Sequence, residues 1–430
     1  MNYYNIRQPS QCVSFKDAVM QGLAADQGLY MPEWVRSLPK EFLNEIPNLS
    51  FPEIALTVAL NMLNDDLPPD EIRKLIDRSI TFDAPLVRVE EDVYSLELFR
   101  GPTLAFKDFG ARFLANLMSL FAADVKEKIT VLVATSGDTG GAVANGFAGV
   151  EGTRVVVLYP QHRVSQLQEK QFTTLGGNIT ALEVKGTFDD CQRMVKQAFV
   201  DEACRQQLLL TSANSINIGR LIPQTFYYFR ALAQLPKNQN VVVAVPSGNF
   251  GNLTAGLLAK GMGLRIRRFI AATNANDIVP QYMASGIFSP KPSVTTLSTA
   301  MDVGNPSNFE RMMDLYAGNH TLVKQDVHAI AISDAATKDA MRDVFANRGY
   351  IMDPHAAVAY QALRLLRQRD ESAIFLETAH PAKFKNEVEE ILGLSIDIPE
   401  ALRAAAEGEK RSILIEPTFQ ALKDVLLQLR

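Results

Sequence analysis

This chain of 430 residues is poor in cysteine and lacks any long apolar run. Its three cysteines, Cys12, Cys191 and Cys204, are scattered and have no CxxC spacing. This argues against a disulfide framework and a structural zinc site, and we expect a protein of the reducing cytoplasm. The first residues contain no apolar signal segment, and no later stretch approaches the ~18 apolar residues of a membrane span. We therefore expect neither targeting nor membrane association.

The sequence also lacks an excess of positive charge. Its 43 lysines and arginines stand against 48 acidic residues, which gives a formal net charge of -5. Because no basic surface is available to follow a phosphate backbone, we do not expect nucleic-acid binding. By contrast, 47% of the residues are hydrophobic, so the chain can bury large cores in two or three structural units.

Short β-branched segments alternate with helical patterns through most of the chain. This alternation predicts an α/β fold in which mostly parallel strands are covered by helices on both faces. The clearest strands are expected at 129–135, 154–160, 241–247, 268–274 and 372–378. Ligands of such sheets bind at the carboxyl ends of the strands. The residues that follow each strand are therefore the first candidates for a functional site.

Residues 1–90 show no strong strand pattern and predict a mainly helical segment that wraps around the rest of the chain. The sequence FPEIALTVALNMLNDD at 51–66 predicts a helix, and Gly28 and Pro32 mark turns. We find no internal repeat and no low-complexity tract.

Two of the expected strands run directly into glycine-rich turns that open helices. These turns are SGDTGG at 136–141 and SGNFGNLTAG at 247–256. Backbone N–H groups and the positive end of a helix dipole meet at such a turn, and glycine lets an anion come close. Neither turn has the spacing of a Walker loop or of a GxGxxG dinucleotide site. The turns predict ligands with at least two anionic groups, unless glycine serves only the tight connection.

Lys107 lies at the start of a predicted helix, among apolar residues. It follows a turn at Gly101 and Pro102, and large apolar side chains recur at helical spacing from Phe109 to Phe121. The pKa of a lysine amine is ordinarily about 10.4, and desolvation at the positive end of a helix disfavours the charged form. Lys107 is therefore placed to act as a nucleophile, although most lysines are solvated surface charges.

Six motifs, taken in their order along the chain, resemble one known family. They are GPTLAFKDFG (101–110), TSGDTGGAVA (135–144), SANSINIGR (212–220), PSGNFGNLTAG (246–256), DPHAAVAY (353–360) and TAHPAKF (378–384). Together they closely resemble the threonine synthases of the bacterial type. The resemblance covers essentially the whole chain, because YNIRQP (4–9) and DQGLYMPE (26–33) fit the same family.

This resemblance implies a fold, a cofactor and a reaction. The fold would be that of fold-type II pyridoxal-phosphate enzymes, similar to the tryptophan synthase β family, with two α/β domains and a mainly helical N-terminal segment. The cofactor would be pyridoxal 5'-phosphate. The enzyme would be a lyase that converts O-phosphohomoserine and water to threonine and phosphate, in the last step of threonine biosynthesis. Bacterial-type members further suggest a monomer without an allosteric effector.

The same resemblance implies how the chain is divided. An N-terminal segment at 1–90 would be followed by the first part of a large domain at 91–120. A small domain at 121–224 would interrupt this large domain, which would resume at 225–430.

For the cofactor, the resemblance implies that Lys107 is the Schiff-base lysine. Thr378 is implied to place a neutral hydroxyl against the pyridine nitrogen, which would not keep that nitrogen protonated. As an alternative, Thr378 caps the helix that begins at AHPAKF. The residues implied to hold the cofactor phosphate are Ser247, Gly248, Asn249, Phe250 and Gly251.

For the substrate, the resemblance implies two loops. The carboxylate loop comprises Thr135, Ser136, Gly137, Asp138 and Thr139, and the phosphate loop comprises Asn214, Ser215, Asn217 and Arg220. The role of Asp138 stays open, because an ionised Asp would repel the phenolate of the cofactor. Arginine suits phosphate because its guanidinium is planar and permanently charged; the alternative for Arg220 is a solvated surface side chain.

Two other functions stay open. A serine or threonine dehydratase, or a β-replacement enzyme, would share Lys107 and the glycine-rich turn, but its substrate needs no second phosphate site such as SANSINIGR. A non-catalytic metabolite-binding protein is the other alternative, and the presence of Lys107 argues against it. His355 and His380 lack a third ligand at suitable spacing, so we expect them to cap or brace loops, and no metal is implied.

Overall fold

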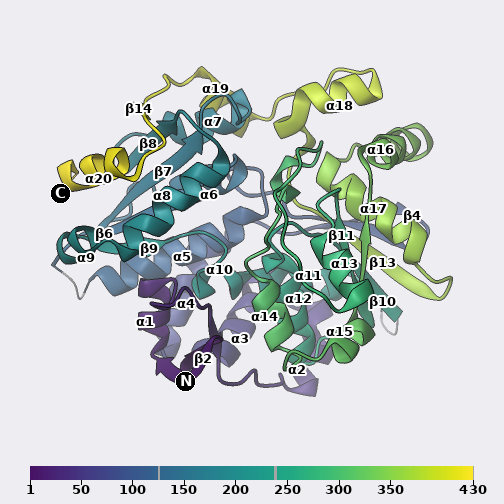
Figure 1. The fold of residues 1–430 in the computed structure, drawn as a ribbon. Helices are drawn as coiled ribbons and strands as arrows, with labels where there is room; N and C mark the ends of the chain where they lie inside the picture. The colour runs from purple at the N-terminus through teal and green to yellow at the C-terminus, as the bar shows by residue number, and fades with distance from the viewer. Residues whose placement is uncertain (124–125, 237–239, 430) are drawn as a thin grey trace.

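The computed structural model describes residues 1–123, 126–236 and 240–429. Within these residues the chain forms a six-stranded sheet, here the large sheet, a five-stranded sheet, here the small sheet, and a three-stranded N-terminal sheet. Figure 1 shows the small sheet and the large sheet side by side, each covered by helices. This arrangement confirms the α/β fold expected from the alternating sequence pattern.

The large sheet has the strand order β12-β11-β10-β13-β5-β4. Neighbouring strands are parallel except at one edge, where β4 pairs antiparallel with β5. The strands are β4 (Leu86–Glu90), β5 (Val93–Glu97), β10 (Asn240–Pro246), β11 (Arg268–Thr273), β12 (Val327–Ala331) and β13 (Glu371–Glu377). The three strands predicted here are confirmed to within one residue. Every residue of β11 and β13 is buried, as expected for a sheet with helices on both faces.

The small sheet has the order β14-β8-β7-β6-β9, and all its pairs are parallel. Its strands are β6 (Ile129–Ala134), β7 (Thr153–Pro160), β8 (Ile179–Val184), β9 (Leu209–Ser212) and β14 (Ile413–Ile415). The strands predicted at 129–135 and 154–160 are confirmed as β6 and β7.

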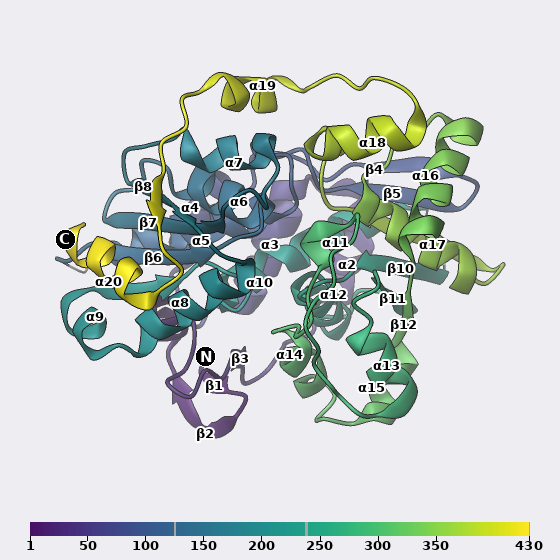
Figure 2. The same ribbon diagram turned by 45° about the horizontal axis from the view of Figure 1, so that its top comes forward.

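Strand β14 differs from the expected division of the chain, which placed 225–430 in the large domain. After α18 (Lys385–Leu392) the chain crosses to the small sheet, where β14 pairs with β8 (Figure 2). The segment stays there because it covers an open sheet edge and an apolar face. Ile415 and, from α20 (Phe419–Gln428), Leu422 and Leu426 belong to the buried cluster of the small sheet.

The N-terminal segment is mainly helical, as expected, but it also contains short strands. Strand β1 (Tyr3–Asn5) pairs antiparallel with β2 (Gln8–Val13) and β3 (Tyr30–Pro32). Two of these strands have three residues, and five of the six positions in β2 are exposed. Such short or exposed strands show no alternation of apolar and polar residues, so the sequence does not reveal them. The predicted helix at 51–66 is confirmed as α3 (Phe51–Leu63).

Helices of three groups complete the fold. Those of the N-terminal segment are α1 (Phe15–Gln21), α2 (Lys40–Glu45), α3 and α4 (Pro69–Ser79). Those near the small sheet are α5 (Lys107–Ala122), α6 (Asp138–Phe147), α7 (Gln166–Thr173), α8 (Phe188–Val200), α9 (Glu202–Gln207), α10 (Ile218–Leu221), α19 (Glu400–Glu407) and α20. Those near the large sheet are α11 (Pro223–Ala233), α12 (Gly251–Gly261), α13 (Ile278–Ser285), α14 (Phe309–Asp314), α15 (His320–Asp326), α16 (Asp334–Arg348), α17 (Pro354–Leu366) and α18.

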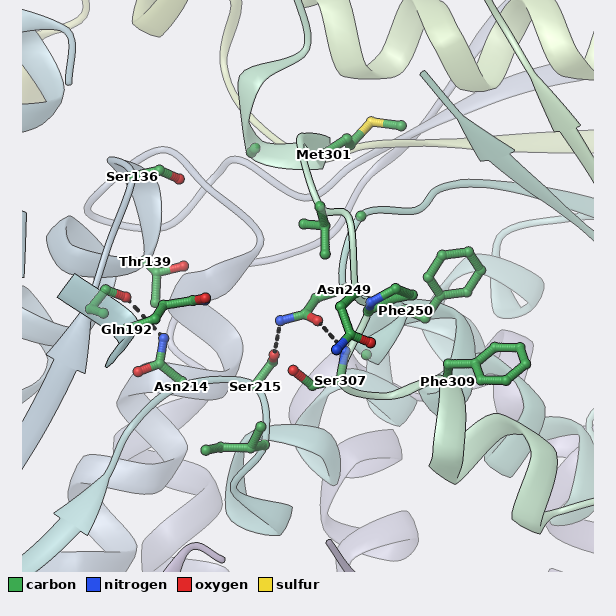
Figure 3. A pocket seen from close by; sticks show the side chains of 18 of the residues that line it. Ser136, Thr139, Gln192, Asn214, Ser215, Asn249, Phe250, Met301, Ser307 and Phe309 are labelled. Carbon is green, nitrogen blue, oxygen red and sulfur yellow. Dashed lines mark hydrogen bonds between the residues drawn. The ribbon is translucent and has the colours of Figure 1, made fainter. Parts of the chain in front are cut away.

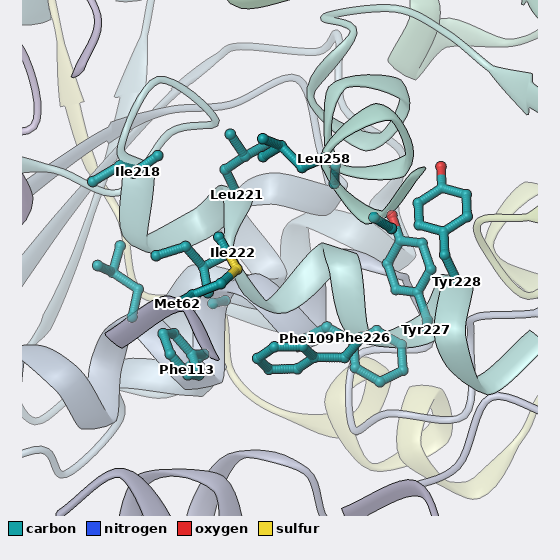
Figure 4. Close-up of a cluster of buried hydrophobic side chains, with 14 of the residues drawn as sticks. Met62, Phe109, Phe113, Ile218, Leu221, Ile222, Phe226, Tyr227, Tyr228 and Leu258 are labelled. Atoms are coloured by element: carbon teal, nitrogen blue, oxygen red, sulfur yellow. The ribbon is translucent and has the colours of Figure 1, made fainter. Parts of the chain in front are cut away.

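The carboxyl ends of β6 and β10 face a common cavity, which Figure 3 shows from close by. Behind it lies an aromatic core between α5 and α11 (Figure 4). The rings of Phe113 and Phe226 lie 6.0 Å apart, and those of Phe109 and Tyr227 lie 5.6 Å apart. The apolar side chains that recur at helical spacing in α5 therefore pack in the core against the aromatic side chains of α11. This packing fixes the direction of α5, whose first residue is Lys107.

Among the described residues, no helix is both long and apolar enough to span a bilayer.

Candidate active site

The cavity has a volume of about 530 Å³ and receives residues from both sheets and from the N-terminal segment. Most of the residues expected at the site line it. They are Lys107, Thr135, Ser136, Thr139, Asn214, Ser215, Arg220, Gly248, Asn249, Phe250, Gly251 and Thr378. Gly137, Asp138, Asn217 and Ser247 are expected site residues that lie behind this lining. The sequence motifs thus converge in space, although not every member of a motif reaches the cavity.

The chain holds Lys107 and Thr378 together through backbone pairing. The N–H of Phe106 donates to the carbonyl of Thr378 at 2.8 Å, and the N–H of His380 donates to the carbonyl of Leu104 at 3.0 Å. Leu104 has a φ of 57°, in the left-handed region that few residues other than glycine adopt. This strained turn allows α5 to begin at the cavity, so that its first side chain enters it.

Lys107 faces a mixed electrostatic environment. Burial lowers the pKa of its amine to about 8; the nearby charge of Asp138 opposes this shift, while the cations Lys383 and Arg220 add to it. The Nζ atom of Lys107 lies 3.9 Å from Oδ2 of Asp138. A substantial fraction of the amine is therefore uncharged near neutral pH, as a nucleophile requires.

Asp138 is the first residue of α6 and turns away from the cavity. Its Oδ1 accepts hydrogen bonds from Nζ of Lys383 at 2.7 Å and from Nε2 of Gln168 at 2.8 Å. Burial alone would raise the pKa of this carboxyl, but the cations Lys383 and Lys107 outweigh burial and hold the pKa well below its ordinary value. Asp138 is therefore a buried carboxylate that is neutralised from behind the cavity wall.

The carboxylate loop is organised by Thr135. Its Oγ1 accepts hydrogen bonds from the N–H groups of Gly137 and Gly140 at 2.9 and 2.8 Å. Gly137 has a φ of 143°, and a Cβ there would lie 2.7 Å from the side chain of Gln168. The turn therefore needs glycine at this position, and it leaves the hydroxyls of Ser136 and Thr139 at the cavity (Figure 3).

The phosphate loop presents Asn214, Ser215 and Arg220 to the cavity, whereas Asn217 faces away from it. The amide of Asn217 is fully buried, donates to the carbonyls of Val19 and Ser212, and accepts from the N–H of Gly219. Its position corrects the expectation of direct contact with a ligand: this side chain caps α10 and ties the loop to α1.

Arg220 is only 3% exposed, which excludes the alternative of a solvated surface side chain. Its Nη1 donates to the carbonyl of Ala213 at 2.5 Å, while its Nε has no hydrogen-bond partner among the described residues. Burial lowers the pKa of Arg220 to about 10, and the charge of Asp108 offsets part of the effect. Nε lies beside Gly110 of α5, but Arg220 also lines the cavity, so its buried guanidinium charge is placed to bind an anion there.

The glycine-rich turn after β10 forms a cup at the start of α12. Phe250 has a φ of 62°, and a Cβ on Gly248 would lie 2.8 Å from the Cα of Met301. Ser247 is buried and donates its hydroxyl to the carbonyl of Val245, so it shapes the turn without lining the cavity. Asn249 donates to Oγ of Ser215 at 3.0 Å, which joins the cup to the phosphate loop (Figure 3).

Thr378 lines the cavity directly after β13. The following helical turn is capped by His380, whose Nδ1 accepts from the N–H of Ala382, so the alternative role of Thr378 as a cap is wrong. His355 accepts from the N–H of Ala300 through Nε2 and contacts Asp353 through Nδ1. Both histidines therefore cap or brace loops, as expected.

Several residues at the site do not follow a predicted strand. Lys383 comes from a helical turn and Gln168 from α7, and both contact Asp138. The segment 302–308 closes one side of the cavity, where the N–H of Ser307 donates to Oδ1 of Asn249 at 2.6 Å (Figure 3). Its sequence, DVGNPSN, is rich in turn-forming residues, and this is the one signal that could have marked it as a loop.

Three known protein families match this chain, and together they cover most of its length. Residues 82–374 match the family described as pyridoxal-phosphate dependent enzyme. Residues 2–80 match the threonine synthase N terminus, and residues 356–426 match the threonine synthase C-terminal family.

The individual relatives and solved structures that are similar to this chain over its whole length are also threonine synthases. The chain is 50% identical to the threonine synthase of Haemophilus influenzae over the full length of both chains, and 46% identical to that of Escherichia coli over 99% of both. It matches the crystal structure of the E. coli threonine synthase with a TM-score of 0.95 and 45% identity over all of both chains. The pyridoxal-phosphate-bound threonine synthase of Brucella melitensis matches with a TM-score of 0.93 and 32% identity, over 100% of this chain and 99% of that one.

Proposed function

This chain belongs to the threonine synthases, and we propose that Lys107 holds its pyridoxal 5'-phosphate and moves the protons of the reaction. The family converts O-phosphohomoserine and water to threonine and phosphate, the last step of threonine biosynthesis. Phosphate leaves from Cγ of the substrate, and water adds at Cβ. The single observation that carries the proposal is that Lys107, whose pKa burial lowers to about 8, shares one cavity with the glycine-rich turn at 247–251 and with Arg220.

The residues of the cavity fit the cofactor. Lys107 supplies an amine whose pKa of about 8 leaves it partly uncharged. The turn at 247–251 offers backbone N–H groups at the start of α12, where the helix dipole favours a phosphate. Thr378 offers a hydroxyl at the end of β13, and its neutrality suits a ring nitrogen that carries no proton.

When bound, pyridoxal phosphate stabilises negative charge that develops at the substrate carbon next to its amine. The protein must then hold the substrate and handle its protons. Lys107 would hold the cofactor, and its amine, once free, would accept the proton from Cα of the substrate and deliver protons along the carbon chain. Asp138 and Lys383 set the charge around that amine from behind the cavity wall.

The substrate has two anionic ends, and we assign each to one loop. Ser136 and Thr139 would bind the carboxylate, because Thr135 holds the turn through the N–H groups of Gly137 and Gly140 and the turn leaves the two other hydroxyls at the cavity. Asn214, Ser215 and Arg220 would bind the phosphate, for which Arg220 provides a buried charge at the cavity lining. Holding both ends fixes the bond between Cγ and the departing oxygen relative to Lys107.

The partner of the protein is a small molecule, and we propose that the chain works as a monomer in the cytoplasm. The cavity is built from residues of this chain, and the three cysteines are unpaired among the described residues. Unpaired cysteines suit a protein of a reducing compartment, and the resemblance to the bacterial-type threonine synthases suggests a monomer.

The test is incubation with O-phosphohomoserine, with phosphate and threonine measured together. We expect equal amounts of both products, and none from a Lys107→Ala protein. Parallel samples that contain serine or threonine in place of O-phosphohomoserine examine the dehydratase alternative, because a dehydratase would convert either amino acid to a 2-oxo acid. Release of a 2-oxo acid without threonine would overturn the proposal.

A further inference from the structure

Arg311, on α14, is one of the most deeply buried charged side chains in the molecule, with no exposed surface. Its guanidinium joins three separate segments through neutral acceptors. Nη2 donates to the carbonyls of Tyr30 and Ile216 at 3.0 and 2.7 Å, and Nη1 donates to Oδ1 of Asn308 at 2.9 Å. A further contact reaches the carbonyl of Ser215 at 3.3 Å. Arg311 thus lies directly behind the phosphate loop and the loop 302–308.

This cation has no carboxylate partner. None of the ion pairs between described residues involves Arg311, and burial lowers its pKa to about 9, an effect that the charge of Asp314 opposes. A buried charge held only by neutral groups is costly unless an anion compensates it. Structural bracing alone would not require a permanent cation at this point, since neutral donors could bind the same carbonyl groups.

Asn308 shows where the compensating anion would bind. Its side chain is fully buried, and because Oδ1 accepts from Arg311, the amide nitrogen must point the opposite way. That nitrogen, Nδ2, has no hydrogen-bond partner among the described residues. It lies 3.3 Å from the position that a Cβ on Gly251 would take, and Gly251 is the first residue of α12. An unused donor therefore faces the start of an 11-residue helix.

We propose that Asn308 donates a hydrogen bond from Nδ2 to a phosphate monoester bound at the start of α12, and that Arg311 is its positioning residue. Arg311 fixes the direction of the amide and places a positive charge behind the phosphate. The inference rests on the proposed function, which supplies two phosphate monoesters for this cavity, that of pyridoxal phosphate and that of O-phosphohomoserine. Gly251 belongs to the cup for the first, and Ser215 beside it belongs to the loop for the second.

The decisive variant is Asn308→Asp, which keeps the shape of the side chain. It replaces the donor by a carboxylate oxygen that repels phosphate, while giving Arg311 an ionic partner. We therefore expect the apoprotein to be at least as stable to heat as the unsubstituted one, so that weaker binding cannot be ascribed to unfolding. Asn308→Ala, which removes the donor without adding charge, should show a smaller loss of the same kind. Asn44→Asp is the control, because Asn44 is an exposed amide of α2 that does not line the cavity.

Three measurements separate the possible phosphates. Equilibrium binding to the apoprotein compares pyridoxal phosphate with pyridoxal, which lacks the phosphate. The rise in thermal midpoint with inorganic phosphate requires neither cofactor nor turnover. The KM and kcat for O-phosphohomoserine are measured with the cofactor at saturation.

For Asn308→Asp we expect at least tenfold weaker binding of pyridoxal phosphate with pyridoxal changed less than threefold, or at least a tenfold higher KM with kcat changed less than threefold. The first result assigns the cofactor phosphate and the second the substrate phosphate, and in either case stabilisation by inorganic phosphate is lost. The Asn44→Asp control should stay within about twofold, because an exposed charge away from the cavity is screened by salt. Equal losses for pyridoxal and pyridoxal phosphate without a rise in KM, or no loss at all, would overturn the proposal. Failure of the proposed function would appear separately, as absence of turnover in the unsubstituted protein.

Discussion

Nζ of Lys383 lies 2.7 Å from Oδ1 of Asp138, and neither side chain reaches solvent to any extent. The other carboxylate oxygen of Asp138 lies 3.9 Å from Nζ of Lys107. Asp138 thus stands between two lysines and is paired more closely with the one outside the cavity lining. This relationship gives Asp138 a role that its motif leaves open. Its charge is balanced by Lys383 instead of being directed at a ligand.

The contacts of Asp138 with Lys107 and Lys383 predict how attachment of the cofactor depends on pH. Because the pKa of Lys107 is about 8, the rate of covalent cofactor attachment to the apoprotein should rise with pH and level off above about this value. Lys383→Met removes a cation and leaves Asp138 free to favour the charged amine, so the inflection should move to higher pH. Asp138→Asn removes the anion, so the inflection should move to lower pH. The rate at which the absorbance of the attached cofactor appears, followed at several pH values, measures both shifts, and shifts of the same sign in the two variants would refute the arrangement.

Arg220 provides a prediction about the substrate phosphate. Arg220→Ala should cost about 2–4 kcal/mol of transition-state stabilisation, or roughly 30- to 1000-fold in kcat/KM. The cofactor absorbance should survive. Arg220→Lys should restore activity only in part, because an ammonium lacks the planar fork of a guanidinium. If Arg220→Ala lost the cofactor as well, the guanidinium would belong to the cofactor phosphate or to the core; normal turnover would remove it from the site.

Replacement of Gly248 tests the glycine-rich turn that is proposed to hold the cofactor phosphate. The structure gives a different reason from the sequence for why a larger residue should not be tolerated there. The sequence suggests that a larger residue would crowd the cofactor phosphate. In the structure, a Cβ at Gly248 would lie 2.8 Å from the Cα of Met301 and 2.9 Å from the carbonyl oxygen of Ala300, so the backbone itself is in the way. Gly248→Ala should therefore lower cofactor retention after dialysis.

The control for this variant is Gly261→Ala at the other end of α12, where a Cβ meets nothing within 4 Å. It should keep its cofactor and gain up to about 1 kcal/mol of stability, because alanine is the better helix residue. Equal retention by the Gly248→Ala and Gly261→Ala proteins would show that the loop at 300–301 yields and that the cup tolerates a side chain.

A fourth prediction concerns stability away from the cavity. Arg268 binds both carboxylate oxygens of Glu371, at 2.9 and 2.6 Å, and both side chains are buried at the amino ends of β11 and β13. Glu371→Ala leaves a buried guanidinium without its partner and should lower the free energy of unfolding by about 3–5 kcal/mol. Because the pair lies at the opposite end of the strands from the site, KM should not change. Denaturant unfolding measures the loss of stability. A large rise in KM would show that the Arg268–Glu371 pair is not independent of the site.

The sequence predicts much of this site because its motifs sit where physical rules are strong. Parallel strands that are buried on both faces are continuous apolar segments, so β6, β7, β10, β11 and β13 could be placed to within one residue. The turns after β6 and β10 could be located because glycine marks a helix start that accepts anions. Lys107 could be singled out because it opens an apolar helix.

What the sequence does not show depends on contacts between distant segments. Short strands such as β1 and β14 form because an edge is available, and their own residues carry no pattern. Asn217 and Ser247 belong to motifs of the site, yet their side chains point away from the cavity. Each loop needs an internal hydrogen-bond donor to hold its shape, and these two side chains supply it. Arg311 and Asn308 lie outside every motif, and only their burial and their direction toward Gly251 set them apart.

The most direct test of the account is to identify the residue that carries the cofactor. The protein is incubated with pyridoxal phosphate, reduced with borohydride, digested and mapped by mass spectrometry. We predict one modified peptide, with the added mass on Lys107, and no modification of this kind in the Lys107→Ala protein. Lys383 is the built-in comparison, because it contacts the same carboxylate but lies outside the cavity lining. Modification of Lys383 or of another lysine, with Lys107 left unmodified, would contradict the central claim.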